Sequence, residues 1–486
     1  MRKKIIALAI LVMLLPLSVI VSSSTIKNTN NEDLDPLVDV SVTVETQAIR
    51  YLEDNLGTDS RYRSIFNKLF FRPKIVNVET PNFFVKVFIN DEEFTSDVWP
   101  NAKFVYSRWS ATSDVPDDQE IVDVKIQLWD MQSGGNNVAC DISGKPTGYD
   151  VELSYNIKTG KWSGDDSIED PSGYGRLCGC DDGSIYVNDN DCELWFDIYQ
   201  EDYDLDGIPY WTEVNEYGSN PEIRDDGDPD DDGIPVDWEY KWGYNPFEWD
   251  DHGKLDPEKD SINNLEEYLT SEWFSDPFRK DVFVEMDIMG EGPEGDRAYF
   301  PSNSVELLNT AFDRQNIVFH LDVGDMGGHD VVPFDSETTH DELHNIYYNY
   351  FLHGDEANWR RGVFHYGVVV YYVDAPPGYM FRSNAYQIAS NLLERKASLP
   401  TLDRDITYAS CYMHELGHTF SFHPIPGHDQ NSKYPWQLGY WQNLPYKSCM
   451  NYGWVYRIVD YSDGSRQDPD IDDWERIDYN DFERER

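Results

Sequence analysis

Alternating hydrophobic and polar positions dominate the chain from about residue 40 to residue 200. Residues 83–89 (FFVKVFI) and 122–129 (VDVKIQLW) show this alternation or short apolar runs of strand length. Clusters of Gly, Asn and Asp, such as residues 133–137, separate the runs and are typical of turns. Short strands divided by turns predict an antiparallel β-sandwich over residues 41–200.

The hydrophobic pattern changes after residue 279, where segments with strand and helix periodicity follow one another. Strands are predicted at 282–288, 316–321 and 367–372, and helices at 302–314, at 385–396 and from about Asp405 onward. This order predicts an α/β domain over residues 279–486, with a mixed sheet flanked by helices.

The first 40 residues have a different character. Arg2, Lys3 and Lys4 precede an uncharged, mostly apolar run at 5–21, and small residues follow it. This order predicts an export signal over residues 1–24 and then a polar linker over residues 25–40. An uncleaved membrane anchor is the alternative, because the apolar run is nearly long enough to span a bilayer. The protein is therefore expected to be secreted or extracellular, or anchored at the cell surface.

The charge of the chain limits its partners. It has 486 residues, with 39 Lys and Arg against 91 Asp and Glu, and a net charge of −52. Nucleic acid is therefore not an expected partner, because phosphate binding requires a positive surface. Aromatic residues make up 14% of the chain, which argues against a disordered acidic polymer. Either a solvating surface or dedicated cation sites can explain the acidic excess.

The six cysteines fit an oxidising compartment. Cys411 and Cys449 stand apart in the C-terminal third, and a disulfide is predicted between them. The other four lie in the first half, and their pairing is left open: Cys140, Cys178, Cys180 and Cys192.

Residues 201–278 contain an internal repeat with the carboxylate spacing of an EF-hand calcium loop. Oxygen ligands are expected at loop positions 1, 3 and 5, from the carbonyl at position 7 and from a Glu at position 12. The first two copies have Gly at position 6 and are followed by Gly-x-Asn-Pro, whereas the third is degenerate. The predicted Ca²⁺ ligands are Asp202, Asp204, Asp206, Ile208 and Glu213 in loop 1, Asp228, Asp230, Asp232, Ile234 and Glu239 in loop 2, and Asp256, Glu258, Asp260, Ile262 and Glu267 in loop 3.

The repeat resembles the Asp-rich calcium repeats of extracellular thrombospondin- and dockerin-like modules. Because the carboxylates repel one another, the segment is expected to be rigid with Ca²⁺ and loose without it. In the sandwich, residues 126–130 and 140–143 resemble calcium- and lipid-binding sandwiches of the synaptotagmin type. That resemblance implies Asp130 and Asp141 as calcium ligands; a purely structural sandwich is the alternative.

The sequence His414-Glu415-Leu416-Gly417-His418 carries the strongest chemical signal. Helix positions i and i+4 share one face, so the two imidazoles can hold one Zn²⁺. Glu415 can take a proton from zinc-bound water. Five upstream histidines have no ligand-like spacing to this motif and are expected to be structural or surface residues: His320, His340, His344, His353 and His365.

The motif on a late helix, followed by Ser448-Cys449-Met450-Asn451-Tyr452, resembles the metzincin metalloproteases. The resemblance implies Met450 as the Met-turn residue beneath the zinc and Tyr452 as a phenol that stabilises an oxyanion. The chain departs from the family at the third ligand. The usual Gly and His positions hold Ser421 and Pro424, and proline has no side-chain donor.

Three residues are candidates for this third zinc ligand. His423 comes first and lies one residue before the usual position. His428 and Asp429 follow the turn at 424–427, which can swing a side chain back to the metal.

Together these features predict a secreted, calcium-stabilised zinc endopeptidase acting on protein or peptide substrates, with Glu415 as general base. One alternative is a non-catalytic, calcium-dependent extracellular binding protein with a degenerate metalloprotease-like domain. Another is a calcium-dependent lipid-binding protein. Membrane contact is expected only through an uncleaved anchor or the sandwich. Substrate specificity and oligomeric state are not indicated by the sequence.

Overall fold

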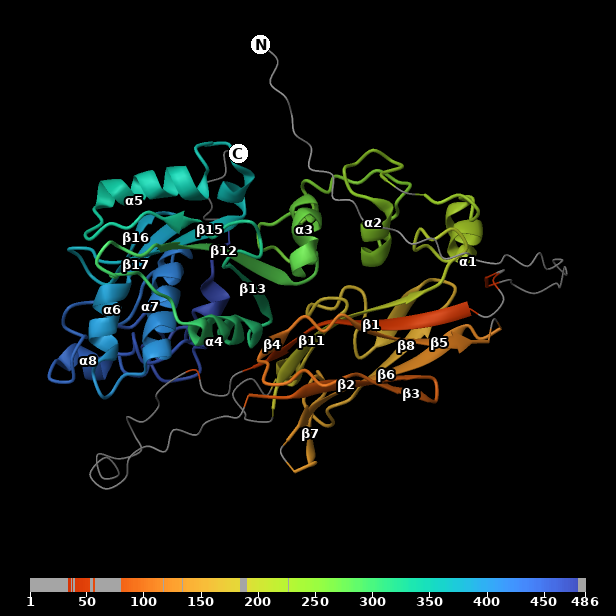
Figure 1. Cartoon of the computed structure of the whole chain (residues 1–486), viewed down its shortest axis with the longest axis horizontal. Helices are drawn as coiled ribbons and strands as arrows, with labels where there is room; N and C mark the ends of the chain where they lie inside the picture. Colours follow the sequence, from red (N-terminus) through yellow and green to blue (C-terminus); the bar gives the residue numbers. More distant parts are fainter. Residues whose placement is uncertain are drawn as a thin grey trace, which may run out of the picture. The chain divides into compact units, whose positions relative to one another are not determined.

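The part of the chain that the structure describes is organised by three β-sheets, two of them antiparallel and one mixed (Figure 1). The computed structural model describes residues 34–35, 37, 40–52, 56, 80–116, 118–132, 134–183, 190–225 and 227–479. The predicted export signal at 1–24 and nearly all of the predicted linker lie outside the described residues. Among the described helices, none has the length and apolar character needed to cross a membrane.

The two antiparallel sheets pack on a shared hydrophobic core. One has the strand order β10-β11-β1-β4, with β5 also pairing with β1; the other has the order β3-β2-β6-β8-β9, with β7 also pairing with β6. Val42 and Val44 of the first sheet and Val124 and Ile126 of the second are buried in this core at alternate positions. The predicted antiparallel strands are thereby confirmed. Their bounds are β1 Val40–Tyr51, β2 Phe83–Ile89, β3 Glu92–Thr95, β4 Phe104–Val105, β5 Trp109–Val115, β6 Ile121–Met131, β7 Asn137–Cys140, β8 Val151–Asn156, β9 Lys161–Gly164, β10 Arg176–Cys178 and β11 Cys192–Gln200.

One short helical segment begins at position 9 of each predicted calcium loop. The position-7 residues Ile208, Ile234 and Ile262 are all buried, and Trp238 and Trp242 join the sandwich core. The repeat is therefore packed against the rest of the protein through apolar side chains. The helical bounds are α1 Tyr210–Thr212, continued by the π-helical turn η2 Glu213–Tyr217, then α2 Val236–Trp242 and α3 Asn264–Thr270.

The mixed sheet has the order β13-β12-β15-β17-β16, with β14 also pairing with β12. Its neighbouring strands run parallel except β16, which is antiparallel to β17 at one edge. Helix α5 covers one face and α4, α6 and α7 cover the other (Figure 1). The bounds are β12 Lys280–Met289, α4 Ser302–Asp313, β13 Ile317–Asp322, β14 Val331–Val332, α5 His340–Ile346, β15 Phe364–Val370, β16 Gly378–Arg382, β17 Ala385–Ala389, α6 Ser390–Ala397, α7 Arg404–Thr419 and α8 Leu438–Gln442.

Two sequence predictions need correction here. The helix predicted at 385–396 is divided into strand β17 and helix α6. All five residues of β17 are buried and pair with β15, so the apolar run reads as an inner strand. The predicted Cys411–Cys449 disulfide is absent, because all six cysteines, each within the described residues, are buried free thiols.

Candidate metal centres

Helix α7 holds the two motif histidines on one face. The Asp403 side chain caps its start by accepting a hydrogen bond from the Ile406 N–H at 3.1 Å. The helix then packs on β17 and β16, and almost all of its residues are buried. His414 is buried and His418 partly exposed, with ring centroids 5.0 Å apart.

His428 completes a group of three imidazoles. One nitrogen from each of His414, His418 and His428 lies within 4.8 Å of the others, and the Nε2 atoms of His414 and His428 are 3.3 Å apart. Burial and the neighbouring rings lower the pKa of all three histidines, to about 4 for His418. They are therefore neutral near pH 7, the form that binds a metal ion.

A turn through Gly427 brings His428 to the helix. Gly427 has φ +74°, and a Cβ at this position would lie 2.4 Å from Asn451 Oδ1. The Tyr452 N–H donates to the Gly427 carbonyl at 3.2 Å, so this turn is fixed to the segment that carries Met450.

The other two candidates for the third ligand are exposed. His423 and Asp429 both face solvent, and the Asp429 carboxylate accepts hydrogen bonds from the Asn431 N–H and the Ser432 hydroxyl. The structure thus favours His428 over His423, the first choice from the sequence. The reason is the close approach of Gly427 to Asn451, which depends on packing between distant segments.

The Met-turn candidate supports the group from below. His414 Nδ1 donates to the Cys449 carbonyl at 2.8 Å, which leaves Nε2 available for a metal ion. A Cβ on Gly417 would lie 2.5 Å from the Met450 sulfur, so the glycine lets this side chain pack directly under the helix. Both contacts fix the ligands before any ion binds.

Glu415 follows His414 on helix α7, and Tyr452 lies beside His414 and His428. Burial raises the pKa of Glu415 to about 8. Its carboxylate lies against Gly378, the first residue of β16, where a Cβ would be 2.4 Å from Glu415 Oε1. The Tyr452 ring centroid is 4.2 Å from that of His428.

The three predicted calcium loops share one backbone geometry. The position-6 N–H donates to the position-1 carboxylate in each loop, from Gly207 and Gly233 at 2.7 Å and from Ser261 at 3.1 Å. The position-7 N–H donates to the position-5 carboxylate, at distances between 2.8 and 3.1 Å. Loop 3 therefore adopts the same fold as the other two, although Ser replaces Gly.

Sequence reasoning missed a later aspartate in each repeat. The N–H groups of Asp225, Asp250 and Asp281 donate to the position-5 carboxylates at 3.1, 3.2 and 2.6 Å. In loop 1, carboxylate oxygens of Asp206, Glu213 and Asp225 converge within 4.8 Å. Each aspartate comes seven residues after a residue with left-handed backbone, namely Gly218, Gly243 and Phe274.

His252 is a second residue that the sequence did not single out. This buried imidazole has Nε2 3.2 Å from Asp232 Oδ2 and 3.4 Å from Glu239 Oε1, and forms one group with both carboxylates. Asn264 lies against its other nitrogen at 3.0 Å. Loop 2 therefore has an imidazole among its carboxylates.

Without a cation, the loop carboxylates favour protonation. Burial, strengthened by nearby acidic groups, raises the pKa of Glu213 to about 8, of Glu239 to about 7 and of Asp260 to about 8. For Glu258 the same causes raise the pKa to about 10. A divalent cation among these groups would favour their ionised form instead.

The aspartates implied by the sandwich resemblance form local hydrogen bonds. Asp130 accepts hydrogen bonds from the Asn82 N–H at 2.7 Å and from Gln132 at 3.3 Å. Asp141 is buried and accepts from the Ser143 N–H at 2.9 Å. Both carboxylates thus hold backbone in place.

The remaining upstream histidines are distributed through the mixed-sheet domain. His320 and His365 are buried, and burial lowers the pKa of both. His340 and His344 lie together on α5 with Nε2 atoms 3.2 Å apart, and His353 is about half exposed beside Asp330.

Comparisons with known proteins leave the family open. No family model matches the chain, and no curated protein matches it. Among solved structures, human group IVD cytosolic phospholipase A2 bound to methyl gamma-linolenyl fluorophosphonate has 11% identity and a TM-score of 0.19, over 34% of this chain and 17% of that one. A C2 domain of plant extended synaptotagmin 1 has 10% identity and a TM-score of 0.19, over 34% of this chain and 95% of that one. Likenesses at this TM-score assign no function to the chain.

Proposed function

We propose that this protein is a zinc-dependent, calcium-stabilised endopeptidase. The observation that carries the proposal is the convergence of His414, His418 and His428, two of them on the helix that also carries the buried Glu415. Three neutral imidazoles and one open position are the ligand set of many catalytic zinc sites.

Bound Zn²⁺ would lower the pKa of a water molecule and polarise a peptide carbonyl. Glu415 would be the base that takes the water proton and would then pass that proton to the leaving amine. Tyr452 stays protonated because burial raises its pKa, so its phenol can donate a hydrogen bond to the oxyanion.

The edge strand β16 suggests the class of substrate. It is an edge strand of the mixed sheet and pairs on one side with β17. Gly378 lies directly against Glu415, so a chain paired to this edge would pass the catalytic carboxyl group. Strand addition to an open edge suits an extended peptide segment.

The resemblance to metzincins gains support from Ser421. This residue occupies the position of the family's glycine, and it has φ +57°, the left-handed conformation that favours glycine. The chain therefore turns at Ser421, just after α7. The third ligand then comes from His428, beyond the position that Pro424 occupies.

The Glu415→Gln variant tests the proposal. It should keep stoichiometric zinc but cleave an unfolded protein substrate about 10²- to 10⁴-fold more slowly, because the general base is lost. The matched control is Glu475→Gln, which changes an exposed glutamate and should retain full activity. Unchanged cleavage by Glu415→Gln would contradict the assigned mechanism. Stoichiometric zinc without cleavage in the wild type would support the non-catalytic binding protein instead.

A further inference from the structure

Buried carboxylate oxygens without a hydrogen-bond partner lie in and next to loop 3. Both oxygens of Glu258, both oxygens of Glu267 and Oδ2 of Asp281 are buried without a hydrogen-bond partner among the described residues. Glu267 is 0% and Asp281 2% exposed. Ionised carboxylates buried in this way are very unfavourable unless a cation or a proton neutralises them. The position-5 carboxylate of Asp260 adjoins them, since its Oδ2 accepts the Asp281 N–H at 2.6 Å.

Asp281 differs from its counterparts because it belongs to the mixed sheet. It is the second residue of β12, opposite Val318 of β13. Its Oδ1 accepts a hydrogen bond from Nε2 of His320, also in β13, and burial keeps this imidazole neutral. One carboxylate oxygen is therefore bound to the sheet, and the other is left for the loop.

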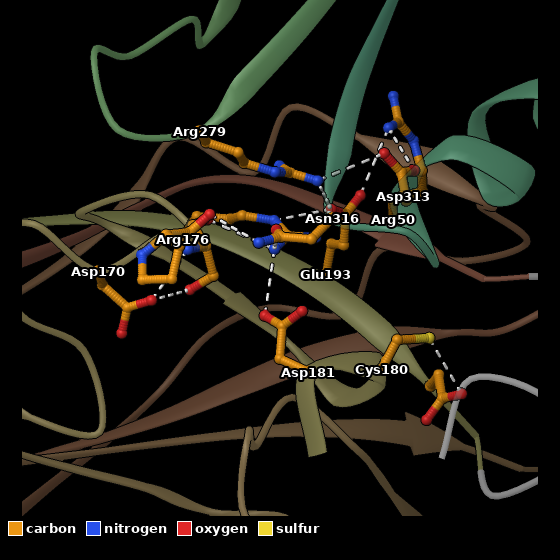
Figure 2. Close-up of polar contacts among 12 residues, drawn as sticks. Arg50, Asp170, Arg176, Cys180, Asp181, Glu193, Arg279, Asp313 and Asn316 are labelled. Atoms are coloured by element: carbon orange, nitrogen blue, oxygen red, sulfur yellow. Dashed lines mark hydrogen bonds and ion pairs between the residues drawn. The ribbon is translucent and has the colours of Figure 1, made fainter. Parts of the chain in front are cut away.

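Arg279, the residue before β12, joins the start of this strand to the sandwich. Its Nη2 lies 3.3 Å from Glu193 of β11 and 3.7 Å from Asp313 at the end of α4. Figure 2 shows Arg279, Arg50 and Arg176 gathered around Glu193. Burial opposes ionisation of Glu193, but these arginines lower its pKa to about 2. The segment 279–281 thus contacts the sandwich, α4, β13 and loop 3.

We propose that loop 3 binds a divalent cation of the calcium class with Asp281 as its last ligand, and that this ion fixes the start of β12. The inference rests on the calcium loops of the proposed function and not on peptide hydrolysis. The ligand charges come from Asp256, Glu258, Asp260, Glu267 and Asp281. Because β12 pairs with β13 and β15, an ion held by Asp281 stabilises the sheet on which α7 packs. The later aspartates of loops 1 and 2, Asp225 and Asp250, lie within the repeat segment. Ions bound there would therefore stabilise the repeat segment itself and not the mixed sheet.

Calcium titration of the full chain tests the ligand assignment, with Ca²⁺ alone as the probe. The wild type should bind three ions. Asp281→Asn keeps an acceptor for His320, and it should bind its third ion at least about tenfold more weakly because one ligand charge is lost. Glu258→Gln changes a half-buried side chain and should weaken the same ion, which guards against a folding defect in Asp281→Asn. Unchanged affinity in both variants would overturn the assignment.

Hydrogen exchange tests the effect on the sheet. Ca²⁺ should slow amide exchange in β12 and β13 of the wild type and of Asp225→Asn, the matched loss of a loop 1 ligand. Glu258→Gln should lose at least about tenfold of that protection at limiting Ca²⁺, since the ion no longer fixes β12. Equal protection in Glu258→Gln and the wild type would overturn the coupling. Absent peptide hydrolysis with these calcium results intact would reject the proposed enzyme and leave this inference standing.

Discussion

The proposed zinc group and the predicted calcium loops are assembled in the same way, but they differ in how the last candidate ligand is positioned. In both, a short motif supplies most ligands and a residue further along the chain completes the set. In the calcium loops that residue follows a left-handed residue by seven positions in every repeat, at Asp225, Asp250 and Asp281. In the zinc group it is His428, ten residues after His418, and nothing else in the chain repeats that spacing.

The difference reflects what positions each last ligand. A loop aspartate is positioned by its own repeat, through a backbone hydrogen bond to the position-5 carboxylate. His428 is positioned by contact between two separate segments, where Gly427 meets Asn451. Local repetition can be read from a sequence, whereas a contact between distant segments cannot.

The largest expected effect is the loss of zinc from His428→Ala. Removing one of three imidazole ligands should weaken zinc binding by more than about 100-fold, beyond the cost of losing an outer-shell partner. Cleavage should fall with zinc content. Zinc per chain after dialysis, measured by mass spectrometry, checks the prediction.

His423→Ala is the matched control, because it removes a nearby but exposed imidazole. This variant should keep its zinc and its activity. Zinc loss from His423→Ala together with retention in His428→Ala would restore the ranking expected from the sequence.

Much of the fold could be predicted because its periodicities are local. The alternation in β2 and β6 and the apolar runs in β12, β13 and β15 indicated strands correctly. The segment 385–396 was misread because a buried strand and a buried helix share an apolar composition over five residues. Sequence spacing also suggested a disulfide that the structure does not contain.

The sequence also predicted the local ligands of each candidate metal site. The ligands of each loop and of the His-Glu-x-x-His motif lie within a short local stretch of backbone. Their spacing in the sequence therefore identifies them. The later aspartates were missed, although the sequence carries a signal for them: each lies four residues after a proline. Loop 3 hides this pattern because Phe274 and Asp276 replace the Gly and Asn of the other copies.

A smaller expected effect is the pH dependence of the free energy of unfolding, which the carboxylates of the predicted calcium loops should dominate. In chelator, the folded chain keeps protons on Glu213, Glu239 and Asp260, whose pKa values are raised to about 8, 7 and 8. The unfolded chain has lost these protons above about pH 4.5. The folded state then binds more protons, so the free energy of unfolding should fall as the pH rises from about 4.5 to about 8.

Calorimetric melting at a series of pH values checks this, with and without Ca²⁺. Saturating Ca²⁺ should flatten the dependence because the cation replaces the protons. Glu213→Gln should reduce the slope in chelator, and Glu216→Gln, an exposed neighbour on the same turn, should not. A slope that is identical with and without Ca²⁺ would contradict this account of the loops.

The smallest effect concerns position 4 of loop 1, where Leu205 has φ +69° and is 63% exposed. A branched side chain in this left-handed conformation is strained, while asparagine tolerates it. Leu205→Asn should therefore stabilise the calcium-bound protein by about 0.5–1 kcal/mol, measured by chemical unfolding. Leu205→Ala removes the same side chain but leaves the strain, so it should give no such gain. Equal stability of the two variants would show that the left-handed turn costs little, and that the repeats are held by their ligands rather than by their backbone.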